Sequence, residues 1–489
     1  MAKDQSTSVK QEPAKIVIAG GGIVGLIFAM AVKRHCGITC EIYEKATKFY
    51  DEVGAALGMY PNGLRVIRDI DPDLLRKIQE AGAPYVYRRW ERHDGTEIAA
   101  AKEDELTEGD WELSSIGIRR WKLQKVLFQA AVGMGIPFHF CKATKDVVVR
   151  DDGLVDVLFE DGSQRTTQLL FGCDGSHSKV REVVAGDATS LEYTGVTCLM
   201  GIAENCPVQQ EGISFPSSHT TGCHSVYFPT GPNEQCFQVH WPIPVEQANS
   251  GNWGNLTDTM SKQECQALAK RLEQDGWHPR FIEPLHHVTH AVRVGFALMK
   301  PRLKKWAYGK NKRVVLVGDA AHPPVPYIGQ GAQMGIEDAG TMAWLLKKLC
   351  VDYKGKFTLN KFDKAVEIYE KIRIPRTGHI LDCSKELGKM QELREDLSAR
   401  EDLELMIQGE LMMNGTLPVM FQGASHHYRM SADKELRKFE LEEERNAISA
   451  YMPGVFELSD AECKRDAKKE EEEMRLAFEA MMYGGAPCQ

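Results

Sequence analysis

Several features are absent from this chain of 489 residues, and each absence removes a class of function. It has no apolar run of roughly 18 residues, so no transmembrane segment is expected. It has no excess of positive charge, and its net charge of −9 argues against nucleic acid as a partner. Residues 1–14 are polar and lack the apolar centre of a secretory signal, so we interpret them as a disordered lead-in.

Paired cysteine motifs are also missing. The thirteen cysteines include no C-x-x-C pair, and their odd number and loose spacing predict reduced thiols in a cytoplasmic protein without a metal site. The remaining composition, 43% hydrophobic and 26% charged, is that of an ordinary globular protein. The length allows two or three domains with a large core.

A glycine fingerprint lies near the start of the chain. An apolar strand over 16–19 is followed by Gly20, Gly22 and Gly25, then by a helical pattern and a second strand that ends at Glu44. The first glycine permits a tight turn, the second lets the backbone approach a pyrophosphate, and the third lets helix and strand pack closely. The helix start attracts phosphate, and the acid can accept hydrogen bonds from ribose hydroxyls. The pattern predicts a bound adenine dinucleotide.

Three later motifs extend this site. Arg120 begins a helical segment, where its planar guanidinium can donate two hydrogen bonds to a phosphate. Asp174 lies in an Asp-Gly turn between a strand and a helix. Asp319 ends a strand and can hold a ribityl hydroxyl, while Gly329 and Gly331 free backbone N–H groups near a helix start. Such N–H groups can face the pyrimidine oxygens of a flavin and stabilise its reduced anion.

Together these motifs resemble the group A flavoprotein monooxygenases, the single-component aromatic hydroxylases typified by p-hydroxybenzoate hydroxylase and salicylate hydroxylase. The fingerprint, the Asp-Gly turn and the Gly-Asp motif at 318–319 occur in the family's order and spacing, over roughly residues 16–376. The resemblance implies non-covalent FAD, reduced by NADPH or NADH. It also implies that O2 supplies one oxygen atom, through a flavin C4a-hydroperoxide, to a small organic substrate that is aromatic or otherwise electron-rich.

The resemblance also assigns residues to the cofactor. By that similarity, Glu44 holds the adenosine ribose. Gly54 and Ala55 line the dinucleotide, and Arg120 contacts phosphate or the ribityl chain.

Five further residues are assigned in the same way. Asp319 holds the ribityl chain, and Gly331 and Ala332 lie at the flavin ring. Asp174 and Arg181 support the paths of FAD and of the nicotinamide.

The expected fold is α/β, or α+β overall: a Rossmann-like FAD-binding domain, an inserted and mostly β substrate domain, and a helical C-terminal extension. Short β-like segments between Pro and Gly turns indicate the inserted sheet. Mixed acids and bases near the end indicate solvated helix faces. The predicted segments are 1–14 for the lead-in, 15–190 for the first part of the FAD-binding domain, 191–296 for the substrate domain, 297–380 for the return segment and 381–489 for the charged helical region.

The substrate domain offers fewer clues. Some relatives that hydroxylate acidic phenols have an Arg before a Gly on the first strand of this sheet; here Met200 precedes the Gly, which favours a more apolar substrate. Weak catalytic candidates are His224, Tyr227 and His240, which lie on strands that could face the flavin and assist proton transfer. The same residue types at these positions would also be expected if the three side chains were only packed or hydrogen-bonded within the sheet. His322, inside the Gly-Asp motif, is expected to be a structural turn residue.

Other functions fit parts of the pattern. The cofactor chemistry would also suit an epoxidase or an indole oxidase, because the pocket sets selectivity. A flavin-dependent halogenase is suggested by Trp241-Pro-Ile243-Pro244, although Val239 replaces the first Trp of that family's W-x-W-x-I-P motif. A non-catalytic scaffold of the GDP-dissociation-inhibitor type has the same FAD fold, but it would have no use for the whole set of cofactor residues.

Overall fold

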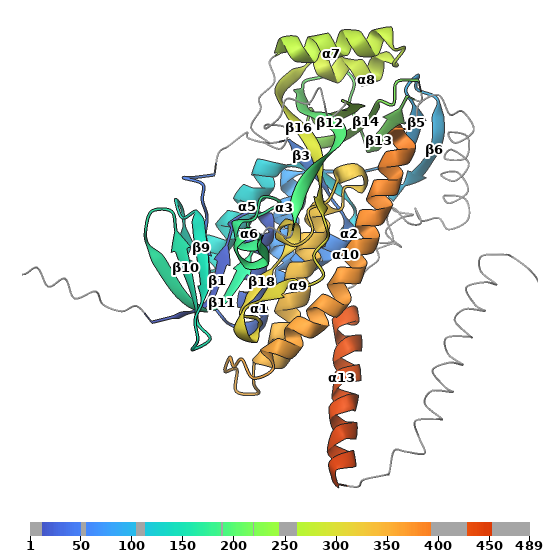
Figure 1. Ribbon diagram of the computed structural model, residues 1–489. Coiled ribbons are helices and arrows are strands. Elements are labelled where there is room, and N and C mark those ends of the chain that lie inside the picture. Colours follow the sequence, from blue (N-terminus) through green and yellow to red (C-terminus); the bar gives the residue numbers. More distant parts are fainter. Residues whose placement is uncertain are drawn as a thin grey trace, which may run out of the picture. The chain divides into compact units, whose positions relative to one another are not determined.

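The computed structural model describes residues 12–49, 55–103, 113–186, 189–218, 220–243, 262–392 and 428–451 (Figure 1). Most of the predicted lead-in and of the predicted region 381–489 therefore lies outside the described residues. Contacts divide the chain into two units, Met1–Ala432 and Asp433–Gln489, and every sheet and cavity discussed below lies in the first. Over the described ranges, no helix combines the length and apolar character needed to cross a bilayer.

A largely parallel sheet forms the centre of the first unit. Its strands are, in spatial order, β17 (Ala307–Tyr308), β18 (Val314–Leu316), β11 (Gln164–Gly172), β1 (Ala14–Ala19), β2 (Glu41–Tyr43) and β8 (Phe138–His139), with β10 (Val155–Phe159) and β9 (Thr144–Val149) as a hairpin paired to β11. Residues 16–19 of β1 are completely buried, as expected for a parallel strand covered on both faces.

Helices cover this sheet and connect its strands. They are α1 (Ile23–Cys36), α2 (Pro61–Ile70), α3 (Pro72–Ala81), α5 (Arg120–Gly133), α6 (Lys179–Ala185), α9 (Gly331–Cys350) and α10 (Phe362–Glu392), and a later helix, α13, spans Tyr428–Tyr451. The chain turns between α2 and α3 because Pro72 cannot donate a helical hydrogen bond; Asp71 then caps α3 by accepting from the N–H of Asp73. Close packing of α1 on α9 requires Gly335, where a Cβ atom would lie 2.6 Å from Val24.

A second sheet has seven strands. Their spatial order is β16 (Val288–Lys300), β12 (Ser190–Glu204), β15 (Glu234–Pro242), β14 (His224–Gly231), β13 (Ile213–Ser217), β5 (Tyr87–Arg92) and β6 (Glu97–Lys102). The last two strands precede the predicted substrate domain, 191–296, in the sequence. A small third sheet contains β3 (Ala56–Met59), β7 (Ile116–Arg119) and β4 (Ala83–Pro84).

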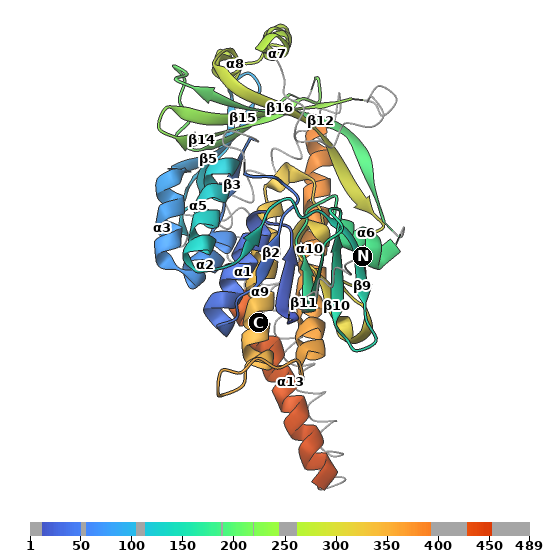
Figure 2. The ribbon, with the colours of Figure 1, turned by 90° about the vertical axis from the view of Figure 1, so that its left-hand side faces the viewer.

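The two faces of the seven-stranded sheet have different partners. Helices α7 (Lys262–Gln274) and α8 (Pro279–His286) pack on one face through a core that contains Leu199 and Phe237. Figure 2 shows these two helices on the opposite side of the sheet from α2, α3 and α5. The other face, with Cys198 and Phe228, packs against Tyr327 of the return segment. The architecture confirms the predicted fold class; the domain boundaries stay predictions.

Candidate active site

The glycine turn after β1 is sterically constrained at two positions and open at a third. Gly20 has φ of +100°, and a Cβ atom there would lie 2.4 Å from the carbonyl oxygen of Cys173. A Cβ atom on Gly25 would lie 2.1 Å from the carbonyl oxygen of Gly20, so strand and helix are as close as backbone atoms permit. A Cβ atom on Gly22 would meet nothing within 4 Å. The backbone of that residue therefore borders open space at the start of α1.

Glu44 is held in place by backbone groups next to this turn. One carboxylate oxygen accepts from the N–H of Gly21 at 2.7 Å, and the other accepts from the N–H of Ala46 at 2.9 Å. Each carboxylate oxygen can accept more than one hydrogen bond, so the side chain keeps capacity for a ligand hydroxyl. Helix α1 begins here with no side-chain cap and no acid in its first turn. Both features leave the positive end of the helix dipole available to an anion.

These groups open onto a cavity of about 410 Å³. The predicted cofactor residues in its lining are Gly20, Gly22, Glu44, Arg120, Asp174, Asp319, Gly331 and Ala332. They come from chain segments that are separated by up to about three hundred positions. Of the other predicted residues, Gly25 supports the turn, Ala55 lines a second cavity, and Gly54 lies outside the described residues.

Two turns at the edge of the parallel sheet are joined by Arg181. Asp174 accepts hydrogen bonds from Ser178 Oγ and from the N–H of Val180, which fixes the Asp-Gly turn against the start of α6. The guanidinium of Arg181 donates to the carbonyl of Ser176 in this turn and to the carbonyl of Ala320 in the Gly-Asp turn. Arg181 therefore fixes the distance between the two turns that border the cavity.

Two side chains of opposite charge line the cavity. Burial raises the pKa of the Asp319 carboxyl, although the charges of His322 and Arg120 act to lower it. Burial lowers the pKa of Arg120, and the charge of Asp319 opposes that shift. Both side chains face the cavity, and an anionic ligand with hydroxyl groups could engage the two together.

A buried network that the sequence analysis did not assign supports the Gly-Asp turn. One oxygen of Asp338 accepts from the N–H of Gly318 at 2.9 Å and lies 2.5 Å from His322 Nε2. The other accepts from Arg373 Nε at 2.6 Å. Burial opposes ionisation, but the charges of His322 and Arg373 hold the pKa of Asp338 below its usual range. The contact of His322 agrees with the structural role expected for it.

The same network extends to Glu337. Its carboxylate accepts from Arg373 at 2.5 Å, from Arg376 at 2.6 Å and from Asn62 at 2.6 Å. It ties α9 to α10 and to α2. The available sequence signal was an acid pair inside the otherwise apolar pattern of α9, together with two arginines three positions apart.

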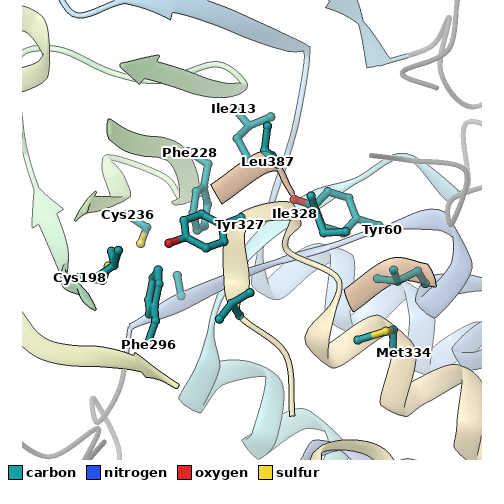
Figure 3. Close-up of a cluster of buried hydrophobic side chains, with 14 of the residues drawn as sticks. Tyr60, Cys198, Ile213, Phe228, Cys236, Phe296, Tyr327, Ile328, Met334 and Leu387 are labelled. Atoms are coloured by element: carbon teal, nitrogen blue, oxygen red, sulfur yellow. The ribbon is translucent and has the colours of Figure 1, made fainter. Parts of the chain in front are cut away.

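A second cavity, of about 240 Å³, lies between the seven-stranded sheet and the return segment. Arg120, Gly331 and Ala332 line both cavities, so the two meet there. The remaining lining is mostly apolar and includes Met200, Phe228 and Tyr327. In Figure 3, Tyr327 points from its loop toward Phe228, Cys236 and Phe296.

Two of the three predicted catalytic candidates lie on the face of the sheet that packs against Tyr327. His224 and His240 are paired across β14 and β15 with ring centroids 4.4 Å apart, and their centroids lie 5.5 and 6.4 Å from that of Tyr327. Burial lowers the pKa of His224 well below its usual value and that of His240 to about 3, so both rings are neutral near pH 7. Their ring nitrogens have no hydrogen-bond partner among the described residues.

Tyr227 lies on the opposite face. Its hydroxyl donates to the carbonyl of Phe281 at 2.7 Å, inside the core beneath α7 and α8. Burial raises the pKa of this hydroxyl. None of Tyr227, His224 and His240 is a lining residue of either cavity. The hydrogen bond of Tyr227 inside this core matches the packed strand residue that the sequence analysis kept as the alternative.

The cysteines bring no further chemistry to these cavities. Those in the described ranges are free thiols, and the reduced state expected from the sequence stays a prediction. Burial raises the pKa of Cys173, which lines the first cavity, and of Cys198 and Cys236 in the neighbouring core. Such thiols are poor nucleophiles.

Comparison with known proteins identifies an FAD-binding family and monooxygenase relatives. A family model described as "FAD binding domain" matches residues 13–367. The chain is 28% identical over 380 residues to a 6-hydroxynicotinate 3-monooxygenase of Bordetella bronchiseptica, covering 76% of this chain and 91% of that protein. It is 27% identical to a 3-hydroxybenzoate 6-hydroxylase of Klebsiella oxytoca, covering 77% and 88% respectively.

Solved structures share the fold at lower identity. Klebsiella pneumoniae HpxO, crystallised with FAD and uric acid, is 22% identical and aligns with a TM-score of 0.68 over 83% of this chain and 97% of its own. A salicylate hydroxylase in complex with substrate is 20% identical, with a TM-score of 0.65 over 86% and 97%.

Proposed function

The chain belongs to the FAD-binding family of group A aromatic hydroxylases, and we propose from this premise that it uses NADPH or NADH, and O2, to insert one oxygen atom into a small aromatic or other electron-rich compound. The observation that supports this most strongly is the pair of connected cavities. One is lined by the predicted cofactor residues, and the other is mainly apolar. The cytoplasmic location inferred from the sequence stays a prediction.

The residues of the first cavity fit FAD. Gly22 and the uncapped start of α1 would receive the pyrophosphate, and Glu44 would receive the adenosine ribose. Asp319 would accept from the ribityl chain, and Gly331 would place the flavin ring where the two cavities meet. When bound, FAD would supply hydride acceptance and oxygen activation.

The protein itself would position the reacting groups and exclude water from the site. With the cofactor bound, the apolar side chains of the second cavity would keep water from the reacting atoms, which limits side reactions. Arg181 and Asp338 hold the two turns at the edge of the first cavity, so that the groups facing the cofactor need no reorganisation.

The direct test is a coupled turnover assay. We expect the purified protein to bind FAD and to oxidise NADPH or NADH faster when a substrate from an aromatic panel is present. Mass spectrometry with isotopically labelled O2 should then find one labelled atom in the product. Accelerated cofactor oxidation that yields only hydrogen peroxide, for every compound in the panel, would contradict oxygen insertion. An epoxide product would assign the chain to the epoxidase alternative.

His224 and His240 do not line the second cavity themselves, but each lies two positions along its strand from a lining residue, Val226 and Gln238 respectively. For these two histidines we propose a hydrogen-bonding role toward substrate. Their low pKa values make both rings poor proton acceptors near pH 7, so proton transfer is the weaker assignment. Replacing His224 by Phe keeps an aromatic ring but removes the ring nitrogens. We expect KM for a hydroxylated or N–H-bearing substrate to rise about 10-fold, the value of one lost hydrogen bond, with kcat little changed.

Tyr227→Phe is the matched control, because it removes a polar group from the opposite face of the same strand. It should leave KM and kcat unaltered. A loss of kcat in His224→Phe, together with a pH profile that loses one limb, would identify His224 as a proton-transferring group instead.

A further inference from the structure

The wall of the second cavity has almost no charge. Three neighbouring positions on adjacent strands face it, namely Met200 on β12, Gln238 on β15 and Val226 on β14. Apart from these, its lining residues are Ala55, Ala56, Leu57, Gly58, Tyr60, Arg120, Ile213, Phe215, Phe228, Pro324, Pro326, Tyr327, Ile328, Gly329, Gly331 and Ala332. Within the described part of the chain, Arg120 is therefore the single lining residue that carries a full charge.

The positive charge of Arg120 already interacts with an acid of the protein. Arg120 also lines the cofactor cavity, where the carboxylate of Asp319 interacts with it. If FAD binds as proposed, Arg120 has the phosphate or ribityl chain to contact as well. It is poorly placed to act as the counter-ion of a substrate.

Other cations near this cavity are neutralised by acids. Arg88 lies 5.1 Å from the ring of Tyr60 and pairs with Glu103 at 2.9 Å, with both side chains buried. Arg119, which precedes α5, pairs with Glu234 at 3.2 Å. Each guanidinium is committed to a carboxylate of the protein itself, so neither supplies excess positive charge to the cavity.

The polar groups on these strands that line the cavity or lie two positions from a lining residue are uncharged as well. His224 and His240 are neutral near pH 7, and Gln238 carries no charge at any pH. A carboxylate that entered this cavity would lose its hydration without gaining a counter-ion, whereas an amide, phenol or ring N–H would lose far less.

We propose that this cavity selects an uncharged aromatic substrate and rejects the corresponding carboxylate, an inference that rests on the proposed function. Among the residues that the structure describes, no cation is available to pair with a substrate carboxylate, and this sets the selection. Shape alone would not distinguish an acid from its amide, because the two have nearly the same volume.

The test uses the FAD-loaded protein and pairs of ligands that differ only in charge. We would titrate salicylate against salicylamide, naphthoate against naphthamide, and indole carboxylate against its carboxamide. Binding is followed by the change in the flavin absorption spectrum. The neutral member of each pair that binds should have a Kd at least about 100-fold lower, since an unpaired carboxylate pays the full loss of hydration.

Gln238→Arg adds the missing cation to the wall, and Gln238→Met is its size-matched neutral control. The arginine variant should reduce the preference for the neutral ligands at least about 10-fold, whereas the methionine variant should retain it. Equal or tighter binding of carboxylates by the unaltered protein would overturn the proposal. So would failure of every ligand in both series to perturb the flavin.

The outcomes separate this inference from the proposed function. Labelled-oxygen insertion into a carboxylate, with the neutral analogue rejected, would overturn the charge selection and leave the monooxygenase assignment intact. Preferential binding of neutral ligands without oxygen insertion into any of them would support the charge selection and overturn the monooxygenase assignment.

Discussion

Replacing Arg373 by methionine is expected to lower the free energy of unfolding by about 3–5 kcal/mol. The guanidinium is completely buried and pairs with Glu337 at 2.5 Å and with Asp338 at 2.6 Å, both of which are also completely buried. Methionine fills much of the same space but leaves two buried carboxylates with fewer partners. The measurement is the urea midpoint of the unfolding transition of the FAD-free protein.

The loss of stability in Arg373→Met should depend on pH. In the unaltered protein the pKa of Asp338 lies below its usual range, so its ionised form is the stabilising one. Without Arg373, burial is expected to raise that pKa above the unfolded value, and the variant then loses stability as the pH rises. The difference in free energy of unfolding between the unaltered protein and Arg373→Met should therefore be larger at pH 8 than at pH 5.

Arg302→Met is the matched control on the protein surface. Arg302 pairs with Asp382 at 2.6 Å, but both side chains are largely exposed, at 41% and 64%. Exposed pairs contribute roughly 0–1 kcal/mol. A destabilisation of similar size in both variants would show that the buried network is not the reason for the effect.

Much of the cavity lined by the predicted cofactor residues could be predicted from sequence because several of its parts are local turn motifs. Gly20 follows β1, Glu44 follows β2, Asp174 follows β11 and Asp319 follows β18. These strands are parallel, so their carboxyl ends meet at one edge of the sheet, where ligands of such folds bind. The turn motif after each strand, together with the family resemblance, predicts these residues without knowledge of the strand order.

The substrate side could not be predicted in the same way because it depends on sheet register. Tyr227 and His224 are three positions apart on one strand and therefore face opposite sides. Which side faces the return segment depends on how β14 pairs with β15, and no local pattern gives that pairing. The contribution of β5 and β6 to this sheet has the same cause, since strands distant in sequence join it by tertiary contact.

The Arg373 network illustrates a second limit. Arg373 and Arg376 lie on α10, and their acid partners lie on α9, so the pairing exists only after the two helices pack. From the sequence alone, a buried acid pair in an apolar helix signals that counter-charges must exist, but it does not identify them.

Replacing Asp319 by Ala should weaken FAD binding about 10- to 100-fold, the usual value of a charge-assisted hydrogen bond, if the carboxylate accepts from the cofactor. Asp319 lies in the turn after β18, faces the cavity, and is the acid opposite Arg120. Its removal takes away both an acceptor and the charge that balances this guanidinium. The Kd follows from titrating the FAD-free protein with FAD and recording the quenching of flavin fluorescence.

Asp319→Asn separates the two effects, since the amide keeps one acceptor oxygen and loses the charge. It should bind FAD with intermediate affinity, and its melting temperature without FAD should match that of the unaltered protein within about 2 °C. Asp363→Ala, at the start of α10, serves as a variant remote from the cavity lining. Full flavin loading of Asp319→Ala at low FAD concentration would contradict the role assigned to this carboxylate. It would also direct attention to Glu44 and the start of α1 as the groups that retain the cofactor, because those contacts do not depend on the Gly-Asp turn.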